Sequence, residues 1–263
     1  MATFVTLASS SAGNSEYIGA CGRGILVDCG ISCRSVESAL KSREIEPESL
    51  SGILITHEHI DHVKGLKVFL KRYNIPLYAT APVLEYLARY GLVPESAELR
   101  ELDEREFVLG GMLVEPFVTS HDSVGSRGYR VTAPDEHRIT VCTDTGYLTP
   151  EAEEHLIGSD AVLIESNYDR MMLMAGKYPY PLKKRIDGRL GHLSNADCAA
   201  FLPRLVKSGT TRIVLGHLSK ENNIPELAEQ TSVSELSLSG MRRDDDYILF
   251  AAPRSELSEN ILL

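Results

Sequence analysis

Three histidines and two acidic residues stand between positions 57 and 62, in the order His57-Glu58-His59-Ile60-Asp61-His62. A protein interior does not hold imidazole and carboxylate at this density unless the groups are paired. A metal ion is the simplest partner, because imidazole and carboxylate together bind zinc, iron or manganese. The alternative is a polar loop whose histidines face water, which suits a lone histidine better than this cluster. The segment therefore predicts a metal site.

The apolar run Ile53-Leu54-Ile55 directly precedes the cluster and indicates a buried strand. Alternate residues of an extended segment point the same way, so His57, His59 and Asp61 can converge on one side. His62 begins the next element and approaches from another direction. This arrangement favours two adjacent ions over one.

Other residues of ligand type also follow apolar stretches. His121, Asp144 and His217 each come after a predicted strand, and Glu165 ends the stretch 161–165. Functional side chains gather at the C-terminal ends of strands in open sheets of this kind. Taken alone, His121 is a weak signal and Asp144 could be an ordinary turn acid. Read after the first cluster, they supply the donors that it lacks.

Short apolar strands alternate with amphipathic stretches along the whole chain. We expect strands at 4–7, 25–30, 52–56, 75–79, 128–132, 138–142, 161–165, 212–217 and 247–251, and helices at 34–44, 63–73, 82–90, 150–157, 195–207 and 225–235. No linker or low-complexity stretch divides the chain. We therefore expect one α/β domain over residues 1–263, with two mixed sheets packed face to face and helices outside.

Composition excludes several classes of protein. The 263 residues are 43% hydrophobic and 24% charged, as in soluble globular proteins, and no apolar run is long enough for a membrane span. An odd count of five cysteines and the absence of a recognisable secretory segment lead us to expect reduced thiols and a cytoplasmic location. A net charge of −10 counts against a protein that coats nucleic acid, but it allows an enzyme that binds a few phosphates.

One segment departs from this acidic average. Between positions 177 and 189, Asp187 is the only acid among the basic residues Lys177, Lys183, Lys184, Arg185 and Arg189. The segment could be a solvated basic face. Its position directly before His192 favours phosphate binding instead. We expect Lys183, Lys184, Arg185 and Ser194 to contact substrate, and Ser194 is also a candidate helix N-cap.

The motif from His57 to His62 resembles the signature of the metallo-β-lactamase fold hydrolases, and the resemblance covers nearly the whole chain. It implies a four-layer αββα sandwich that binds two divalent ions, Zn²⁺ or Mn²⁺, with iron as a third option. It also implies which residues hold them. One ion takes His57, His59 and His121, the other takes Asp61, His62 and His217, Asp144 bridges the two, and Asp28 orients the ligands from beside the metals.

The same resemblance implies a hydrolytic mechanism. A water shared by two divalent cations loses its proton near neutral pH and becomes a nucleophilic hydroxide, and the ions offset negative charge that develops on a phosphoryl or carbonyl oxygen. His192 is not needed as a ligand, so it is a candidate general acid that Glu165 orients. The expected catalytic residues are thus Asp61, His192 and Glu165. An ordinary core or surface role for His192 is the alternative.

Several segments narrow the resemblance to the YycJ or WalJ branch, which is related to the RNase Z and RNase J nucleases. These segments are Leu7–Asn14, Ile164–Asp169, Gly176–Pro179, Leu182–Ile186, Gly191–Asn195 and Gly216–Ser219. Only residues 166–191 separate Glu165 from His192, so the inserted domain of RNase J-type proteins is absent, and the flexible arm of RNase Z is not evident. The branch implies a metal-dependent phosphodiesterase, a nuclease or exonuclease acting on single-stranded DNA or on RNA.

Other functions stay open at this point. A small-molecule hydrolase of the lactonase, thioesterase or glyoxalase type would need neither the basic segment nor His192. A regulatory binding protein without turnover would not need a complete ligand set. A mononuclear iron oxygenase is disfavoured, because Asp61, His62 and His217 complete a second site. The sequence leaves open the metal, the choice of DNA or RNA, the polarity of cleavage and the oligomeric state.

Overall fold

The computed structural model describes residues 1–102, 105–254, 258 and 261–263. The chain forms two compact units. The first comprises residues 1–116, 123–137 and 253–263, and the second comprises residues 117–122 and 138–252.

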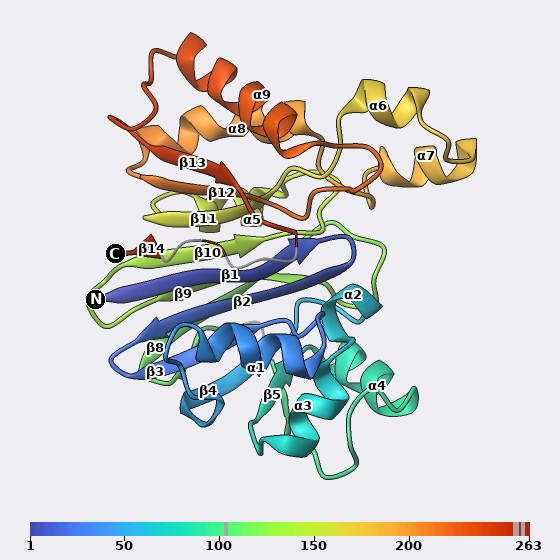
Figure 1. Cartoon of the computed structure of the whole chain (residues 1–263), viewed down its shortest axis with the longest axis vertical. Helices are drawn as coiled ribbons and strands as arrows, with labels where there is room; N and C mark the ends of the chain where they lie inside the picture. The colour runs from blue at the N-terminus through green and yellow to red at the C-terminus, as the bar shows by residue number, and fades with distance from the viewer. Residues whose placement is uncertain (103–104, 255–257, 259–260) are drawn as a thin grey trace. The chain divides into compact units, whose positions relative to one another are not determined.

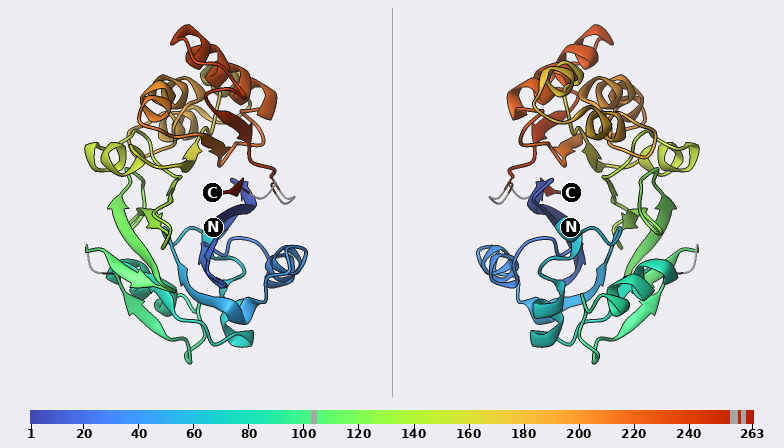
Figure 2. Two further views of the ribbon diagram at one scale, coloured as in Figure 1. Left: turned by 90° about the vertical axis from the view of Figure 1, so that its left-hand side faces the viewer. Right: turned by 90° about the vertical axis from the view of Figure 1, so that its right-hand side faces the viewer.

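The described strands form two seven-stranded sheets. The first sheet has the order β14-β1-β2-β3-β4-β5-β6. It is antiparallel from β14 to β3 and parallel from β3 to β6. Its strands are β1 Ala2–Ser10, β2 Gly13–Ala20, β3 Arg23–Val27, β4 Leu50–Leu54, β5 Leu77–Ala79, β6 Leu99–Glu101 and β14 Ile261–Leu262. Because β14 pairs with β1, the two chain ends lie side by side (Figure 2).

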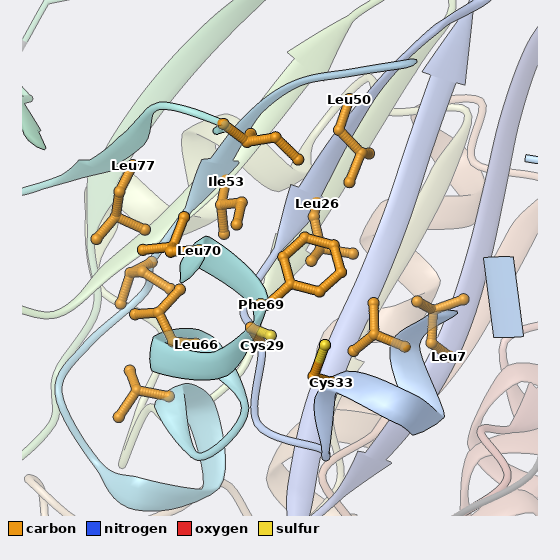
Figure 3. Packing of buried hydrophobic residues seen from close by; sticks show 14 of the residues in the cluster. Leu7, Leu26, Cys29, Cys33, Leu50, Ile53, Leu66, Phe69, Leu70 and Leu77 are labelled. Carbon is orange, nitrogen blue, oxygen red and sulfur yellow. The ribbon is translucent and has the colours of Figure 1, made fainter. Parts of the chain in front are cut away.

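Helices cover one face of this first sheet. They are α1 Cys33–Lys41, α2 Ile60–Val63, α3 Leu66–Arg72 and α4 Ala81–Arg89, with a 3₁₀ turn at Pro47–Ser49. Figure 3 shows Phe69 of α3 among Leu26, Cys29 and other aliphatic side chains of the strands and helices. Phe69, Leu26 and Ile53 are fully buried. This apolar layer fixes the strands whose ends carry the first polar cluster.

Strands β7 Phe107–Leu109, β8 Met112–Val118 and β9 Arg127–Thr132 contribute to the second sheet. The hydroxyl of Tyr129 on β9 donates to the carbonyl of Ile55 at 2.6 Å. The backbone N–H of Arg127 donates to the carbonyl of Thr56 at 3.0 Å. These two contacts hold the segment after β4 within the first unit.

The second unit contains four parallel strands, β10 Arg138–Cys142, β11 Ala161–Glu165, β12 Arg212–Gly216 and β13 Ile248–Ala251. The whole second sheet has the order β13-β12-β11-β10-β9-β8-β7. Helices α5 Pro150–Leu156, α8 Asn195–Lys207 and α9 Pro225–Leu238 pack on the strands of this unit through a shared apolar cluster. Figures 1 and 2 show α8 and α9 side by side over one face of β11 and β12. All five residues of β11 are buried, as expected for a central parallel strand.

The expected α/β class, with two mixed sheets flanked by helices, is confirmed. Two local predictions need correction. The single helix expected at 63–73 is divided into α2 and α3 at Gly65. A Cβ on Gly65 would lie 2.0 Å from the carbonyl oxygen of Ile31, so the backbones approach too closely there for any side chain.

The second correction concerns the basic segment. No helix bounds were predicted between Glu165 and Asn195, where a solvated basic helix face was the alternative to phosphate binding. The structure has α6 Arg170–Ala175 and α7 Tyr180–Ile186 there (Figure 1). Such short helices depend on tertiary packing rather than on intrinsic propensity. Tyr168, Leu173 and Ile186 supply that packing as a small buried cluster. Among the described residues, no helix has the length and apolar character needed to cross a membrane.

Candidate metal centre

Polar side chains gather where the strands end. The segment from His57 to His62 follows β4, and His121 follows β8. In the second unit, β10, β11 and β12 run parallel, with Cys142 beside Ile164 and Glu165 beside Gly216. Asp144, Glu165 and His217 therefore emerge at one edge of the sheet. His121, Asp144 and His217 follow strands as expected. Asp61 and His62 instead lie in α2, so the prediction that an extended segment carries His57, His59 and Asp61 to one side is wrong at Asp61.

The first unit brings three imidazoles together. His57 and His62 are fully buried, and their ring centroids lie 4.1 Å apart. The rings of His57 and His59 are 4.5 Å apart and nearly perpendicular. The loop that carries them packs tightly, because a Cβ on Gly30 would lie 1.7 Å from the carbonyl oxygen of Asp61. Gly30, which follows β3, therefore allows the backbone of the segment from His57 to His62 (the histidine loop) to pack directly against it.

A buried carboxylate orients this cluster. Asp28 accepts from the backbone N–H and the hydroxyl of Thr56 at 2.9 and 2.8 Å, and it lies 2.6 Å from Nδ1 of His62. Burial raises the pKa of the Asp28 carboxyl, although the charge of His62 opposes that rise. With Nδ1 bonded to Asp28, Nε2 of His62 is the nitrogen available to a metal. The orienting position expected for Asp28 is the one observed.

Asn14 is a site residue that sequence reasoning did not single out. Its side-chain amide nitrogen lies 3.1 Å from Nε2 of His62 and 3.4 Å from the carbonyl oxygen of Asp61. The sequence signal for it was its place in the segment Leu7–Asn14, and the structure places it in β2. Asn14 therefore contacts two of the expected ligand residues from a strand remote in sequence.

The second unit contains a denser cluster. Asp144, Glu165, His192 and His217 each offer a donor atom, and these atoms all lie within 4.8 Å of one another. Oε1 of Glu165 lies 2.8 Å from Nδ1 of both His192 and His217. Oε2 of Glu165 accepts from the backbone N–H groups of Thr145 and Leu193 at 2.8 and 3.2 Å. The predicted pairing of Glu165 with His192 is confirmed, and the equal contact with His217 was missed.

This bonding defines the electrostatics of Glu165. Burial alone would raise the pKa of its carboxyl, yet attraction to His192 and hydrogen bonds from His192 and His217 hold that pKa below its ordinary value. An ionised carboxylate accepts from Nδ1–H of each ring. In His217, Nε2 then carries the lone pair that a metal ligand requires. In His192, which is not an expected ligand, Nε2 is the ring nitrogen that does not contact Glu165.

His121 joins the same cluster. Its Nδ1 lies 3.0 Å from the carbonyl oxygen of Gly191, and its Nε2 lies 3.6 Å from Oδ1 of Asp144. Burial lowers the pKa of His121 against the opposing charge of Asp144. A lowered pKa keeps the imidazole neutral, which is the form that binds metals.

Three of these residues have strained backbones. Asp28, Asp144 and His217 have φ angles of 60°, 55° and 54°, in the left-handed region that favours glycine. Such conformations cost on the order of 1–3 kcal/mol each and concentrate at functional sites. The strain here turns side chains at the ends of β3, β10 and β12 towards their clusters.

The donor set fits divalent metal ions. Imidazoles whose Nδ1 is held by oxygen and carboxylates at strand ends are ligands for zinc, manganese and iron. In the second unit these donors lie close enough together to share one ion, and they are largely buried. The residue types therefore suit a metal centre, and so do the contacts that Asp28 and Glu165 make with Nδ1 of His62 and His217.

The expected substrate-binding residues have different environments. Lys183 donates to the carbonyls of Met174 and Gly176 at 2.7 Å each, and Arg185 forms an ion pair with Asp122. Lys184 is exposed, and its ammonium lies 5.1 Å from the centre of the Tyr180 ring. Ser194 accepts from the N–H of Asp197 and caps α8, which confirms the N-cap prediction.

Comparison with known proteins identifies the family. Residues 23–218 match the family model described as the β-lactamase superfamily domain. The chain belongs to the β-lactamase superfamily. The metallo-β-lactamase fold protein YhfI from Bacillus subtilis has a similar fold. That structure has a TM-score of 0.75 and 14% sequence identity, and the match covers 98% of this chain and 100% of YhfI.

Two closer relatives place the chain within the superfamily. It is 40% identical over 235 residues to the exodeoxyribonuclease WalJ of Streptococcus pneumoniae, covering 88% of this chain and 87% of WalJ. It is 36% identical over 236 residues to the exodeoxyribonuclease YycJ of Bacillus anthracis, covering 89% of this chain and 88% of YycJ. The resemblance to the WalJ and YycJ branch, drawn from motifs, is confirmed.

Proposed function

We propose that the chain is a metal-dependent exodeoxyribonuclease that hydrolyses phosphodiester bonds of single-stranded DNA. The observation that carries this proposal is the Asp144, Glu165, His192 and His217 cluster, found in a chain 40% identical to an enzyme named for this activity. The fold alone would not support it, because one fold hosts many chemistries.

We assign the ligands from the superfamily resemblance. His57, His59 and His121 would hold one divalent ion, Asp61, His62 and His217 would hold a second, and Asp144 would contribute to both. Zn²⁺ and Mn²⁺ are the ions we propose, since both accept imidazole and carboxylate. Residues 1–263 act as one domain in this assignment, because both units contribute ligands.

When bound, two divalent ions would supply a nucleophilic hydroxide near neutral pH and would offset negative charge on the phosphate. The residues of the chain supply the remaining functions. Glu165 holds Nδ1–H of His192 at 2.8 Å, which directs Nε2 of that ring away from the carboxylate. A proton on Nε2 can then pass to the oxygen that leaves phosphorus. Asp61 completes the catalytic set as a carboxylate of the histidine loop.

The basic segment is proposed to contact the strand. Lys184 and Arg185 are both exposed, but Arg185 is paired with Asp122, so we assign Lys184 to a backbone phosphate. Lys183 and Arg185 already bond to carbonyls and to Asp122, and we propose that they fix α7 while lending positive potential. Ser194 holds the start of α8, where its hydroxyl donates to the carboxylate of Asp197 at 2.6 Å, and we propose that it contacts substrate from there.

A cytoplasmic location fits this function. All five cysteines are free thiols, and four of them are buried. Unpaired thiols are typical of reducing compartments. The DNA of a bacterial cell lies in that compartment.

The direct test uses end-labelled single strands of DNA and RNA with one sequence, incubated with Mn²⁺ or Zn²⁺. We expect stepwise shortening of the DNA. His192→Ala should lower the rate by about 10²–10⁴-fold, the usual contribution of a general acid. The control is His137→Ala, a histidine outside both clusters, which should cleave as wild type does.

Turnover of a lactone or thioester without cleavage of either polymer would contradict the nuclease function and favour a small-molecule hydrolase. Unchanged cleavage by His192→Ala would remove only the proposed acid.

A further inference from the structure

A pocket of about 410 Å³ opens on the second unit between residues 146–148 and α8. Its volume lies within the range of roughly 300–1,000 Å³ typical of ligand sites. Gly146, Tyr147, Leu193, Asp197, Phe201 and Arg204 are among the residues that line it. None of them is an expected metal ligand or a residue of the basic segment.

The pocket adjoins the catalytic cluster through the backbone. Leu193 follows His192 directly, and consecutive Cα atoms are about 3.8 Å apart. Gly146 is two residues from Asp144. The N–H groups of Leu193 and Thr145 donate to Oε2 of Glu165 at 3.2 and 2.8 Å. The backbone that holds Glu165 therefore also forms one wall of the pocket.

Two arginine–aromatic contacts lie at the pocket. Tyr147, Phe201 and Arg204 line it, and Arg189 of the basic segment lies against Tyr147. The guanidinium of Arg189 lies 3.9 Å from the centre of the half-buried Tyr147 ring. The guanidinium of Arg204 lies 4.8 Å from the centre of the Phe201 ring. Aromatic faces beside arginine planes are the surfaces on which proteins stack single-stranded bases.

The charges favour a base over a phosphate as the occupant. Arg204 is paired with the carboxylate of Glu153 at 2.7 Å, and Asp197 adds a second carboxylate. Two carboxylates disfavour a phosphate by charge repulsion. A nucleobase edge suits them, because carboxylates accept from its amino groups and arginine donates to its ring nitrogens and carbonyl oxygens.

We propose that this pocket binds a nucleobase of the strand next to the phosphodiester bond that is cleaved, with the base stacked on Tyr147. The inference rests on the proposed nuclease function and deepens it by naming a subsite. It predicts that the enzyme senses the presence of a base at one position beside the cleaved bond.

The experiment combines a protein change with a substrate change. Single strands with one abasic residue, placed in turn at each position near the labelled end, are cleaved by wild type, Tyr147→Leu and Tyr147→Phe. Tyr90→Leu is the control, because Tyr90 also has an arginine, Arg89, 5.7 Å from its ring and does not line the pocket. Binding of the same strands to metal-free protein, followed by fluorescence anisotropy, gives a readout without turnover.

We expect one abasic position to lower kcat/KM of wild type roughly tenfold, in line with the stacking of one base on an aromatic ring. Tyr147→Leu should cause a similar loss on the intact strand. It should cause little further loss on that abasic strand, because the protein change and the substrate change remove the same stacking interaction. Tyr147→Phe, which keeps the ring, should retain most of the activity. The dissociation constants should follow the same pattern.

Equal losses by Tyr147→Leu on intact and abasic strands would overturn the nucleobase subsite and leave the nuclease function standing. So would losses no larger than those of Tyr90→Leu. Absence of cleavage of any strand by wild type would instead refute the proposed function, and the subsite with it.

Discussion

Glu165 holds two imidazoles with a single oxygen. Its other oxygen accepts two backbone N–H groups, so one carboxylate fixes His192, His217 and the segments beside Asp144 and Leu193. A buried carboxylate without these donors would be costly. Glu165 therefore positions both His192, the proposed acid, and His217, a proposed metal ligand.

Replacing Glu165 should therefore give a loss of stability that depends on pH. The folded pKa of Glu165 is lowered, so its contribution is present above the unfolded pKa of about 4.3 and is lost as the pH falls through the lower folded value. In metal-free protein, we expect Glu165→Gln to lower the free energy of unfolding at pH 7 by about 3–5 kcal/mol, the usual cost of breaking a buried pair. Urea unfolding of both proteins from pH 7 to pH 3 measures the difference, which should shrink below about pH 4.3. A difference that stays constant over this range would contradict the ionised state of Glu165.

Residue types and spacing predicted the histidine loop, the strand-end acids and the pairing of Glu165 with His192. They did not predict the bond from Glu165 to His217, which spans 52 positions and needs β11 and β12 side by side. The role of Asn167 was also missed, because its contact is with a residue that is distant in sequence. Its side chain donates to the carbonyl of His217 at 2.6 Å. Amides carry no sequence signature of such a role, because most of them lie on surfaces.

At the scale of elements, α3 connects the apolar core to the histidine loop. Phe69 is fully buried in the cluster drawn in Figure 3, and Tyr73 lies 4.8 Å away, between ring centroids. Because α2 begins within the histidine loop and α3 follows at Gly65, the packing of α3 positions His62.

Truncating Phe69 tests this packing. Phe69→Ala should lower the free energy of unfolding by about 3–5 kcal/mol, since it removes apolar contacts and leaves a cavity. Its neighbour Val68 is 58% exposed, so Val68→Ala should change stability by about 0.5 kcal/mol or less. Urea titration of the two variants beside wild type gives the comparison, and equal effects would contradict the described core.

Strand positions followed well from apolar runs, because buried parallel strands have a strong hydrophobic pattern. The break at Gly65 and the helices α6 and α7 did not follow. Each depends on a tertiary contact, with Ile31 in the first case and with the Tyr168 cluster in the second. Local sequence does not contain those contacts.

At the scale of the whole molecule, the net charge of −10 contrasts with a substrate that is itself an anion. Resident divalent cations would reverse the local potential at the strand ends where the ligands lie. The expectation that residues 1–263 form one domain stays a prediction.

The most direct test of this account is the metal content of the protein. Wild type, Asp144→Asn and Glu58→Gln are loaded with Mn²⁺ or Zn²⁺, dialysed, and analysed by inductively coupled plasma mass spectrometry. Both substitutions convert a carboxylate to an amide, but Glu58 lies within the histidine motif and outside the proposed ligand set. We expect about two ions per chain for wild type and Glu58→Gln, as in two-ion hydrolytic sites, and no more than about one for Asp144→Asn. Two ions retained by Asp144→Asn, or a single ion in wild type, would contradict the proposed metal centre.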